Sequence, residues 1–173
     1  PQRGEKRQLL TMAADNARTL LAARRTVAAR PDPEAGVAEL AEALGLDVLP
    51  EVMECFDISH IQGAETVASM VVFRNGEPDK RSYKRFKIAS TEGKPDDFRA
   101  MQEVVLRRYS KQEWPLPDLV IIDGGKGQLS SALTIIRQLG HDSLPVVSLA
   151  KQFEEIYGEG ESDPVVLPRD GEA

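Results

Sequence analysis

Two aspartates lie at the ends of apolar runs of the kind that form buried strands. Asp57 lies near the end of the run over residues 51–58, and Asp123 closes the nearly continuous apolar run that begins after Asp118. If the two strands are parallel neighbours, their carboxyl ends meet at one edge of the sheet, where open α/β sheets bind ligands. Two carboxylates about 4 Å apart repel by about 4 kcal/mol at an effective dielectric near 20, so such a pair normally shares a proton or binds a cation. We therefore interpret Asp57 and Asp123 as metal ligands. The alternative is that each caps a turn or the next helix.

The remaining residue types indicate which metal and which reaction. The chain has one cysteine and two histidines, which excludes a cysteine-rich metal site. Hard carboxylate oxygens suit Mg²⁺ or Mn²⁺, and these ions assist phosphoryl transfer, so a metal-assisted phosphodiesterase is the natural reaction class. Cys55 is predicted to be a buried core residue. His60 is a further candidate ligand, with a hydrogen-bonded loop histidine as the alternative.

Basic and aromatic residues supply candidate DNA contacts. In the strand predicted over residues 82–88, alternation puts Tyr83, Arg85 and Lys87 on one face, where they can touch a DNA backbone. A charged, solvated edge strand is the competing interpretation. The segment DGGKGQ (residues 123–128) lacks the spacing of a Walker A loop, but its glycines and Lys126 can approach a DNA phosphate at the start of a helix. The alternative for these glycines is a tight turn between strand and helix.

The periodicity predicts the elements that position these residues. Helices are expected over residues 3–29, 36–44, 97–109 and from the glycine segment to residue 139. Strands are expected over residues 51–58, 66–73, 82–88, 118–123 and 144–149, with an Asn-Gly turn at residues 75–76. This order, three antiparallel strands followed by helix, strand, helix and strand, specifies an α/β fold with a mixed sheet complete by about residue 149. The first fifty residues are expected to form a separate helical segment (1–50), followed by the core domain (51–173).

Composition limits the class of protein. With 173 residues, 41% of them apolar, the chain fits one domain with a helical extension. No apolar run reaches the roughly 20 residues that span a bilayer, so we expect a cytoplasmic protein. The net charge of −6 argues against nucleic-acid binding by bulk electrostatics alone, and any such binding must be local.

Three segments together resemble the UvrC family of bacterial nucleotide excision repair: ECFDISH (54–60), VASMVVF (67–73) and DLVIIDGGKGQL (118–129). PQRGEKR (1–7) and SLAK (148–151) also look like that family. The resemblance implies a ribonuclease H-like fold and a metal-dependent endonuclease that makes the 5′ incision at lesions. It also implies damaged double-stranded DNA as substrate and UvrB, with UvrA, as partners.

Carried over by position, Asp57 and Asp123 match the family's metal-binding aspartates, and Asp97 matches a third acidic position tied to the incision. On pattern alone Asp97 lies where a helix N-cap belongs. The family's site also includes a histidine on a helix beyond LPR (167–169), so we expect the domain to be truncated at its carboxyl end. Two alternatives stay open: an inactive DNA- or protein-binding module on the same fold, and a nucleotide-binding protein that uses the glycine turn.

Overall fold

The computed structural model describes residues 32–61, 65–91, 96–111, 114–150, 155–160 and 164–166. The helix predicted over residues 3–29 lies outside them. The described helices are α2 (Pro33–Ala43), a 3₁₀ turn η1 (Lys80–Ser82), α3 (Asp97–Tyr109) and α4 (Lys126–Gln138). The strands are β1 (Val52–Ile61), β2 (Glu65–Arg74), β3 (Glu77–Pro78), β4 (Lys84–Lys87), β5 (Leu119–Asp123), β6 (Val146–Ala150), β7 (Glu155–Tyr157) and β8 (Val165–Val166).

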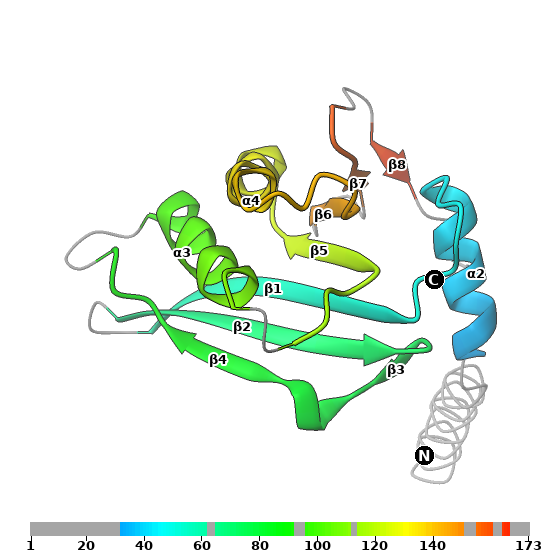
Figure 1. The fold of residues 1–173 in the computed structure, drawn as a ribbon, viewed down its shortest axis with the longest axis horizontal. Helices are drawn as coiled ribbons and strands as arrows, with labels where there is room; N and C mark the ends of the chain where they lie inside the picture. Colours follow the sequence, from blue (N-terminus) through cyan, green and yellow to red (C-terminus); the bar gives the residue numbers. More distant parts are fainter. Residues whose placement is uncertain are drawn as a thin grey trace, which may run out of the picture. The chain divides into compact units, whose positions relative to one another are not determined.

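Within these residues the strands form one mixed sheet in the order β3-β2-β1-β5-β6-β7-β8, and β4 also pairs with β2 (Figure 1). β2 is antiparallel to β1, β3 and β4, whereas β1, β5 and β6 are parallel. The predicted mixed α/β sheet is thus confirmed. The expectation that it is complete by residue 149 is wrong, because β7 and β8 extend it by antiparallel pairing.

The third strand differs from its prediction in a way that moves side chains. After a hairpin turn at Asn75 and Gly76, both with positive φ, the chain pairs only briefly as β3. It then leaves the sheet as η1 and returns as β4. The hydroxyl of Ser82 donates to the Asp79 carboxylate across this turn, at 2.8 Å. The strand with alternating side chains therefore begins at Lys84. The faces predicted for the side chains from residue 84 onward are confirmed, whereas the face predicted for Tyr83 is wrong.

The two faces of the sheet are covered differently. One face carries α3 and α4, which lie side by side in Figure 1, over a buried cluster that includes Phe56, Met101 and Ile122. At one end of the other face, Val37 of α2 packs in a second cluster with Met53 and Leu119. The sheet-bearing unit therefore begins at Pro33. The boundary predicted at residue 50 wrongly separated α2 from the domain, because the apolar side of this helix is part of its core.

No helix in the described part of the chain is long and apolar enough to cross a membrane.

Candidate metal and nucleic-acid site

Asp57 and Asp123 are neighbours across two parallel strands. The pairing of β1 with β5 runs up to Phe56 beside Ile122, so the next residue on each strand is an aspartate. Phe56 and Ile122 are fully buried beneath α3 and α4. Because side chains alternate along a strand, both aspartates point to the opposite face, and adjacent strands lie about 4.8 Å apart. The structure thus brings the two half-buried carboxylates together on one face.

A row of polar side chains extends from this pair across the sheet. Asp57 pairs in register with Ser69 of β2, and Ser69 pairs with Arg85 of β4, so all three share the face. Two residues along β1, the hydroxyl of Ser59 donates to Asp57 Oδ2 at 3.0 Å. This hydrogen bond orients one carboxylate oxygen of Asp57. Arg85 is exposed and lies two strands away from Asp57 on the same face.

The other predicted basic contacts are already engaged with neighbouring side chains. Lys87, which shares the face of Arg85, donates to Glu65 Oε1 at 2.6 Å. This hydrogen bond and the positive charge of Lys87 lower the pKa of the Glu65 carboxyl. Lys126 lies with its ammonium 4.5 Å from the centre of the Tyr157 ring. Both lysines are exposed, and exposed ion pairs and cation–π contacts each contribute about 1 kcal/mol or less, so a phosphate can compete for them.

Tyr83 does not share the face of Arg85. It caps the end of η1, and its partly buried ring packs against the cluster under α3 and α4. The predicted grouping of Tyr83 with Arg85 and Lys87 is wrong because the strand begins only at Lys84, so the alternation of the strand does not include Tyr83.

Asp97 is placed away from the aspartate pair. The N-cap of α3 is its neighbour Asp96, whose side chain accepts from the Arg99 amide, so Asp97 is not the capping residue. Asp97 Oδ1 instead lies 2.6 Å from Nε2 of His60, and its Oδ2 accepts a long hydrogen bond of 3.5 Å from Gln128. His60 lies four residues after Phe56 on β1, so both side chains point to the same face. The Asp97–His60 pair therefore lies on the α3 side of the sheet. Among the described residues no three His, Cys, Asp or Glu side chains are close enough to hold a metal.

His60 is held from both sides, because its Nδ1 lies 3.2 Å from the hydroxyl of Thr66, its partner in the β1–β2 register. It is a strand residue rather than a loop histidine. The alternation of side chains along β1 puts residues 56, 58 and 60 on one face, and this pattern in the sequence could have placed His60 on the side of α3. The second histidine, His141, lies edge-to-face with Tyr109 at 6.4 Å. Cys55, the sole cysteine of the chain, is half-buried rather than buried.

The glycine segment serves close packing between helices. A Cβ at Gly127 would lie 2.6 Å from the ring of Phe98, so the start of α4 contacts the start of α3 at this glycine. A Cβ at Gly124 would lie 1.9 Å from the Gln128 side-chain oxygen, which accepts from the Gly125 amide at 3.0 Å. These contacts favour the tight-turn interpretation and tie Gln128, the Asp97 partner, to the end of β5.

Residues 41–173 match the family model described as the UvrC RNAse H endonuclease domain. Among curated relatives, UvrABC system protein C of Gemmatimonas aurantiaca is 49% identical over 174 residues, covering 98% of this chain and 28% of the relative. The protein of the same name from Salinibacter ruber is 47% identical over 182 residues, covering 100% and 29%. The chain thus spans less than a third of the length of these relatives.

Among solved structures, the catalytic domain of human Endonuclease V aligns with a TM-score of 0.42 at 16% identity, covering 79% of this chain and 59% of that one.

Proposed function

We propose that this chain, which belongs to the UvrC RNAse H endonuclease domain family, is a divalent-metal-dependent DNA endonuclease that makes the 5′ incision at lesions in nucleotide excision repair. The observation that supports this most is the register of β1 and β5, which places Asp57 beside Asp123 on one face of the sheet. An endonuclease with this ribonuclease H-like fold needs its acidic ligands side by side, and here two strands distant in sequence supply them.

The donor set fits a hard divalent cation. Two carboxylates, with Ser59 holding one oxygen of Asp57, offer only oxygen ligands. Mg²⁺ is commonly bound by one or two carboxylates together with water and substrate phosphate, so the pair suffices for Mg²⁺ or Mn²⁺. When bound, such an ion would supply an activated water and neutralise charge at the scissile phosphate. The two carboxylates, whose mutual repulsion a cation relieves, would hold it.

The chain's basic residues would position the DNA backbone over the same face. Arg85 lies in the row that contains Asp57, roughly 10 Å away at a strand spacing near 4.8 Å. Its planar guanidinium suits a phosphate, and Lys87 extends the positive charge along β4. Lys126, at the start of α4, would contact a phosphate near Asp123. These contacts position the duplex without reading its sequence.

The cellular setting is inferred from relatives that are much longer than this chain. Their name, UvrABC system protein C, points to a complex with UvrA and UvrB. We propose that the complete protein acts with these partners on damaged double-stranded DNA, in the cytoplasm.

The test uses the complete protein with its excision-repair partners on a lesion-bearing duplex. Asp57→Asn and Asp123→Asn are expected to abolish the 5′ incision in Mg²⁺ or Mn²⁺. The matched control is Asp118→Asn, at the opposite end of the β5 segment, where the carboxylate accepts from the Val52 amide at 2.8 Å. It should incise at the parent rate. Incision by either of the first two variants near that rate would show that the pair does not hold the metal. A parent chain that binds no Mn²⁺ would favour the inactive binding module.

A further inference from the structure

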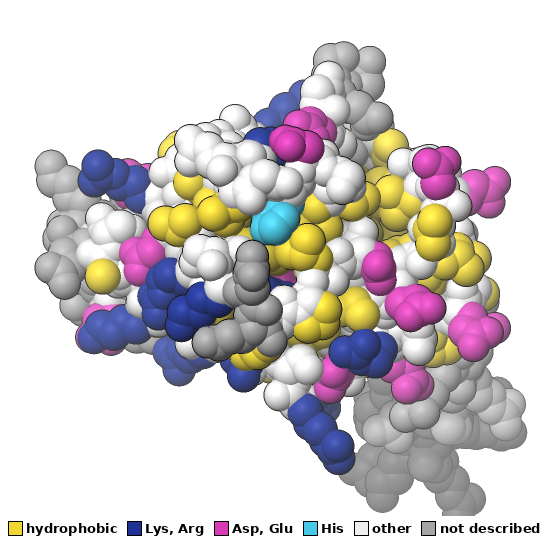
Figure 2. All heavy atoms as spheres, viewed as in Figure 1, with side chains coloured by type: hydrophobic (Ala, Val, Ile, Leu, Met, Phe, Trp, Pro, Cys, Tyr) yellow, Lys and Arg dark blue, Asp and Glu magenta, His cyan; other side chains and the backbone are white. Residues whose placement is uncertain are grey.

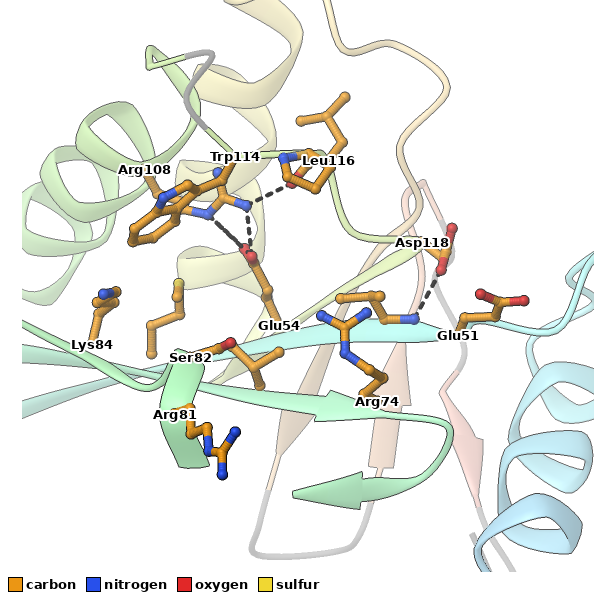
Figure 3. A pocket seen from close by; sticks show the side chains of 14 residues that line it. Glu51, Glu54, Arg74, Arg81, Ser82, Lys84, Arg108, Trp114, Leu116 and Asp118 are labelled. Carbon is orange, nitrogen blue, oxygen red and sulfur yellow. Dashed lines mark hydrogen bonds and ion pairs between the residues drawn. The ribbon is translucent and has the colours of Figure 1, made fainter. Parts of the chain in front are cut away.

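A hollow of about 510 Å³ lies on the α3 side of the sheet, near the start of β1 (Figure 3). It is distinct from the metal face, because Asp57 lies later in β1 and points to the other side. Its base includes Met70 and Val72, which are almost fully buried. Lys84 of β4 lies at its side, and Trp114 and Leu116 of the segment before β5 form a wall.

A buried ion pair holds the inner wall rigid. The guanidinium of Arg108 donates to both oxygens of Glu54 at 2.7–3.1 Å and also to the Pro115 carbonyl at 2.9 Å. The hydroxyl of Tyr109 donates to Glu54 Oε2 at 2.7 Å. Burial, together with the neighbouring Glu54 charge, raises the pKa of the Tyr109 hydroxyl, so it remains a donor. The Glu54 charge is thus neutralised within the protein, so the other charged side chains that line the hollow determine its net charge.

Trp114, the sole tryptophan of the chain, stands between this hollow and a second one. It is 41% exposed, which is high for a side chain that prefers burial. The Lys84 ammonium lies 4.6 Å and the Arg108 guanidinium 5.2 Å from the centre of its ring. The second hollow, of about 120 Å³, is lined by Phe86, Arg107, Arg108, Lys111 and Trp114. An exposed indole is therefore flanked by basic side chains on both sides.

The charge around the two hollows is mainly positive at the rim. Arg81 and Lys111 have no ion-pair partner in the described part of the chain, and the Lys84 ammonium lies over the Trp114 ring. Of the acids in the larger hollow, Glu54 is neutralised by Arg108 and Asp118 accepts from a backbone amide, while Glu51 is exposed. Figure 2 shows Lys and Arg side chains gathered toward the α3 and β4 side of the molecule and Asp and Glu toward α2. An acidic protein thus carries a local basic surface here.

We propose that the two hollows around Trp114 bind a single-stranded segment of DNA, in which a base takes the place of the Lys84 ammonium over the indole and phosphates lie beside Lys84, Arg81 and Lys111. Single-strand binding sites combine a basic groove with exposed aromatic rings, and stacking needs an unpaired base. A duplex keeps its bases stacked inside and would use only the charges. An acidic peptide would use the charges too, but it has no flat ring system to match the exposed indole.

The path of such a strand follows from the alternation in β4. This strand pairs only with β2 among the described residues, so its outer edge is open. Lys84 points to the Trp114 side, and its neighbour Arg85 points to the face of Asp57. DNA displaced from a duplex on the metal face can therefore pass around β4 to reach Trp114. Binding at Trp114 does not depend on the proposed cleavage, so each can fail without the other.

The first test uses the intrinsic fluorescence of Trp114 in the 173-residue chain, with EDTA present so that cleavage plays no part. Titration with a short oligothymidylate should quench the fluorescence, because a base stacks on the only indole. A matched blunt duplex should quench it far less. If the oligothymidylate leaves the fluorescence unchanged at low salt, the proposal is wrong and a protein partner becomes the better occupant.

The second test uses variants and the anisotropy of a labelled oligothymidylate. Trp114→Ala should weaken binding by roughly 5- to 150-fold, the range for loss of one stacked base. Lys84→Ala should reduce the slope of log affinity against log salt by about 0.7, one phosphate contact on a single strand. Lys80→Ala, which removes the same charge outside both hollows, should change neither. Circular dichroism confirms that each variant is folded, and parent-like binding by folded Trp114→Ala would refute the proposal.

Discussion

Replacing Asp57 by asparagine should raise the stability of the metal-free protein. The substitution keeps the shape of the side chain and an oxygen for the Ser59 hydroxyl, and removes one of two adjacent negative charges. At about 5 Å, two unit charges repel by about 1 kcal/mol in water and about 3 kcal/mol at an effective dielectric of 20. Because both carboxylates are half-buried and Asp123 has a further polar contact, we expect a gain of about 1 kcal/mol. For a chain of this size that raises the Tm by about 2–4 °C.

Mn²⁺ should reverse which of the two proteins, the parent or Asp57→Asn, is the more stable. At a free concentration one hundred times its Kd, a ligand that binds only the folded state stabilises it by about 2.7 kcal/mol. The parent Tm should then rise by roughly 5–11 °C, whereas Asp57→Asn, with one ligand removed, should gain little. The asparagine variant is therefore the more stable protein in EDTA and the less stable one in Mn²⁺.

Thermal unfolding with EDTA and with Mn²⁺, at one ionic strength, measures both effects. Asp118→Asn controls for loss of an aspartate near β5 and should keep the full Mn²⁺ shift. The metal-ligand assignment is refuted if Asp57→Asn lowers the metal-free Tm and retains the parent's Mn²⁺ shift. That outcome would return Asp57 to a turn-capping role.

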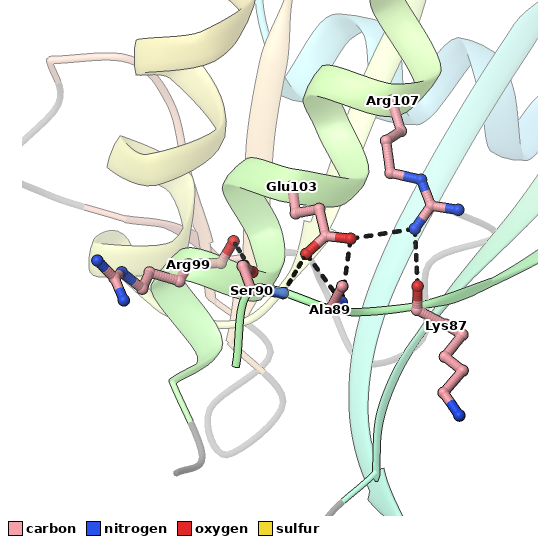
Figure 4. Close-up of polar contacts among 6 residues, drawn as sticks. All are labelled: Lys87, Ala89, Ser90, Arg99, Glu103 and Arg107. Atoms are coloured by element: carbon pink, nitrogen blue, oxygen red, sulfur yellow. Dashed lines mark hydrogen bonds and ion pairs between the residues drawn. The ribbon is translucent and has the colours of Figure 1, made fainter. Parts of the chain in front are cut away.

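Three further predictions concern the surroundings of the two sites. Arg108→Met should lower the free energy of unfolding by about 3–5 kcal/mol, because Glu54 would be left buried without its partner. The double variant Arg108→Met with Glu54→Leu should recover part of this loss. If urea denaturation gives the single and the double variant the same loss, the assignment of a buried ion pair is contradicted. Gly76→Ala should destabilise by about 1–3 kcal/mol more than Gly45→Ala, since both have positive φ but only at Gly76 would a Cβ meet backbone, 2.4 Å from a carbonyl of α2. Burial opposes ionisation of Glu103, but hydrogen bonds from the backbone amides of Ala89 and Ser90 and from Arg107 outweigh it and lower its pKa below the usual 4.5 (Figure 4). Its stabilisation is therefore present at pH 7 and lost as the pH falls through the lowered pKa, so Glu103→Gln should be less stable than the parent at pH 7 and converge with it toward pH 3.

Local patterns in the sequence were enough to locate most elements and the aspartate pair. The strand ending at Asp123 followed from its continuous apolar character, and the bounds of α3 were predicted to the residue. Such patterns are readable because burial repeats with the period of the helix or strand. Adjacency of Asp57 and Asp123 followed from one topological rule for parallel strands, and the register of β1 and β5 agrees with it.

Only the tertiary structure decided which side chains meet across the sheet and between helices. It pairs Asp97 with His60, buries Glu54 against Arg108, and begins the strand expected at residues 82–88 only at Lys84, after a 3₁₀ turn. It also exposes Trp114 between two hollows. The contacts of Asp97 with His60 and of Glu54 with Arg108 join residues that are far apart in the sequence, where no helix or strand period links them. Their proximity depends on the register of the strands and on how closely α3 and α4 approach. A sequence pattern specifies the face on which a residue lies, whereas the partner on that face is set by packing.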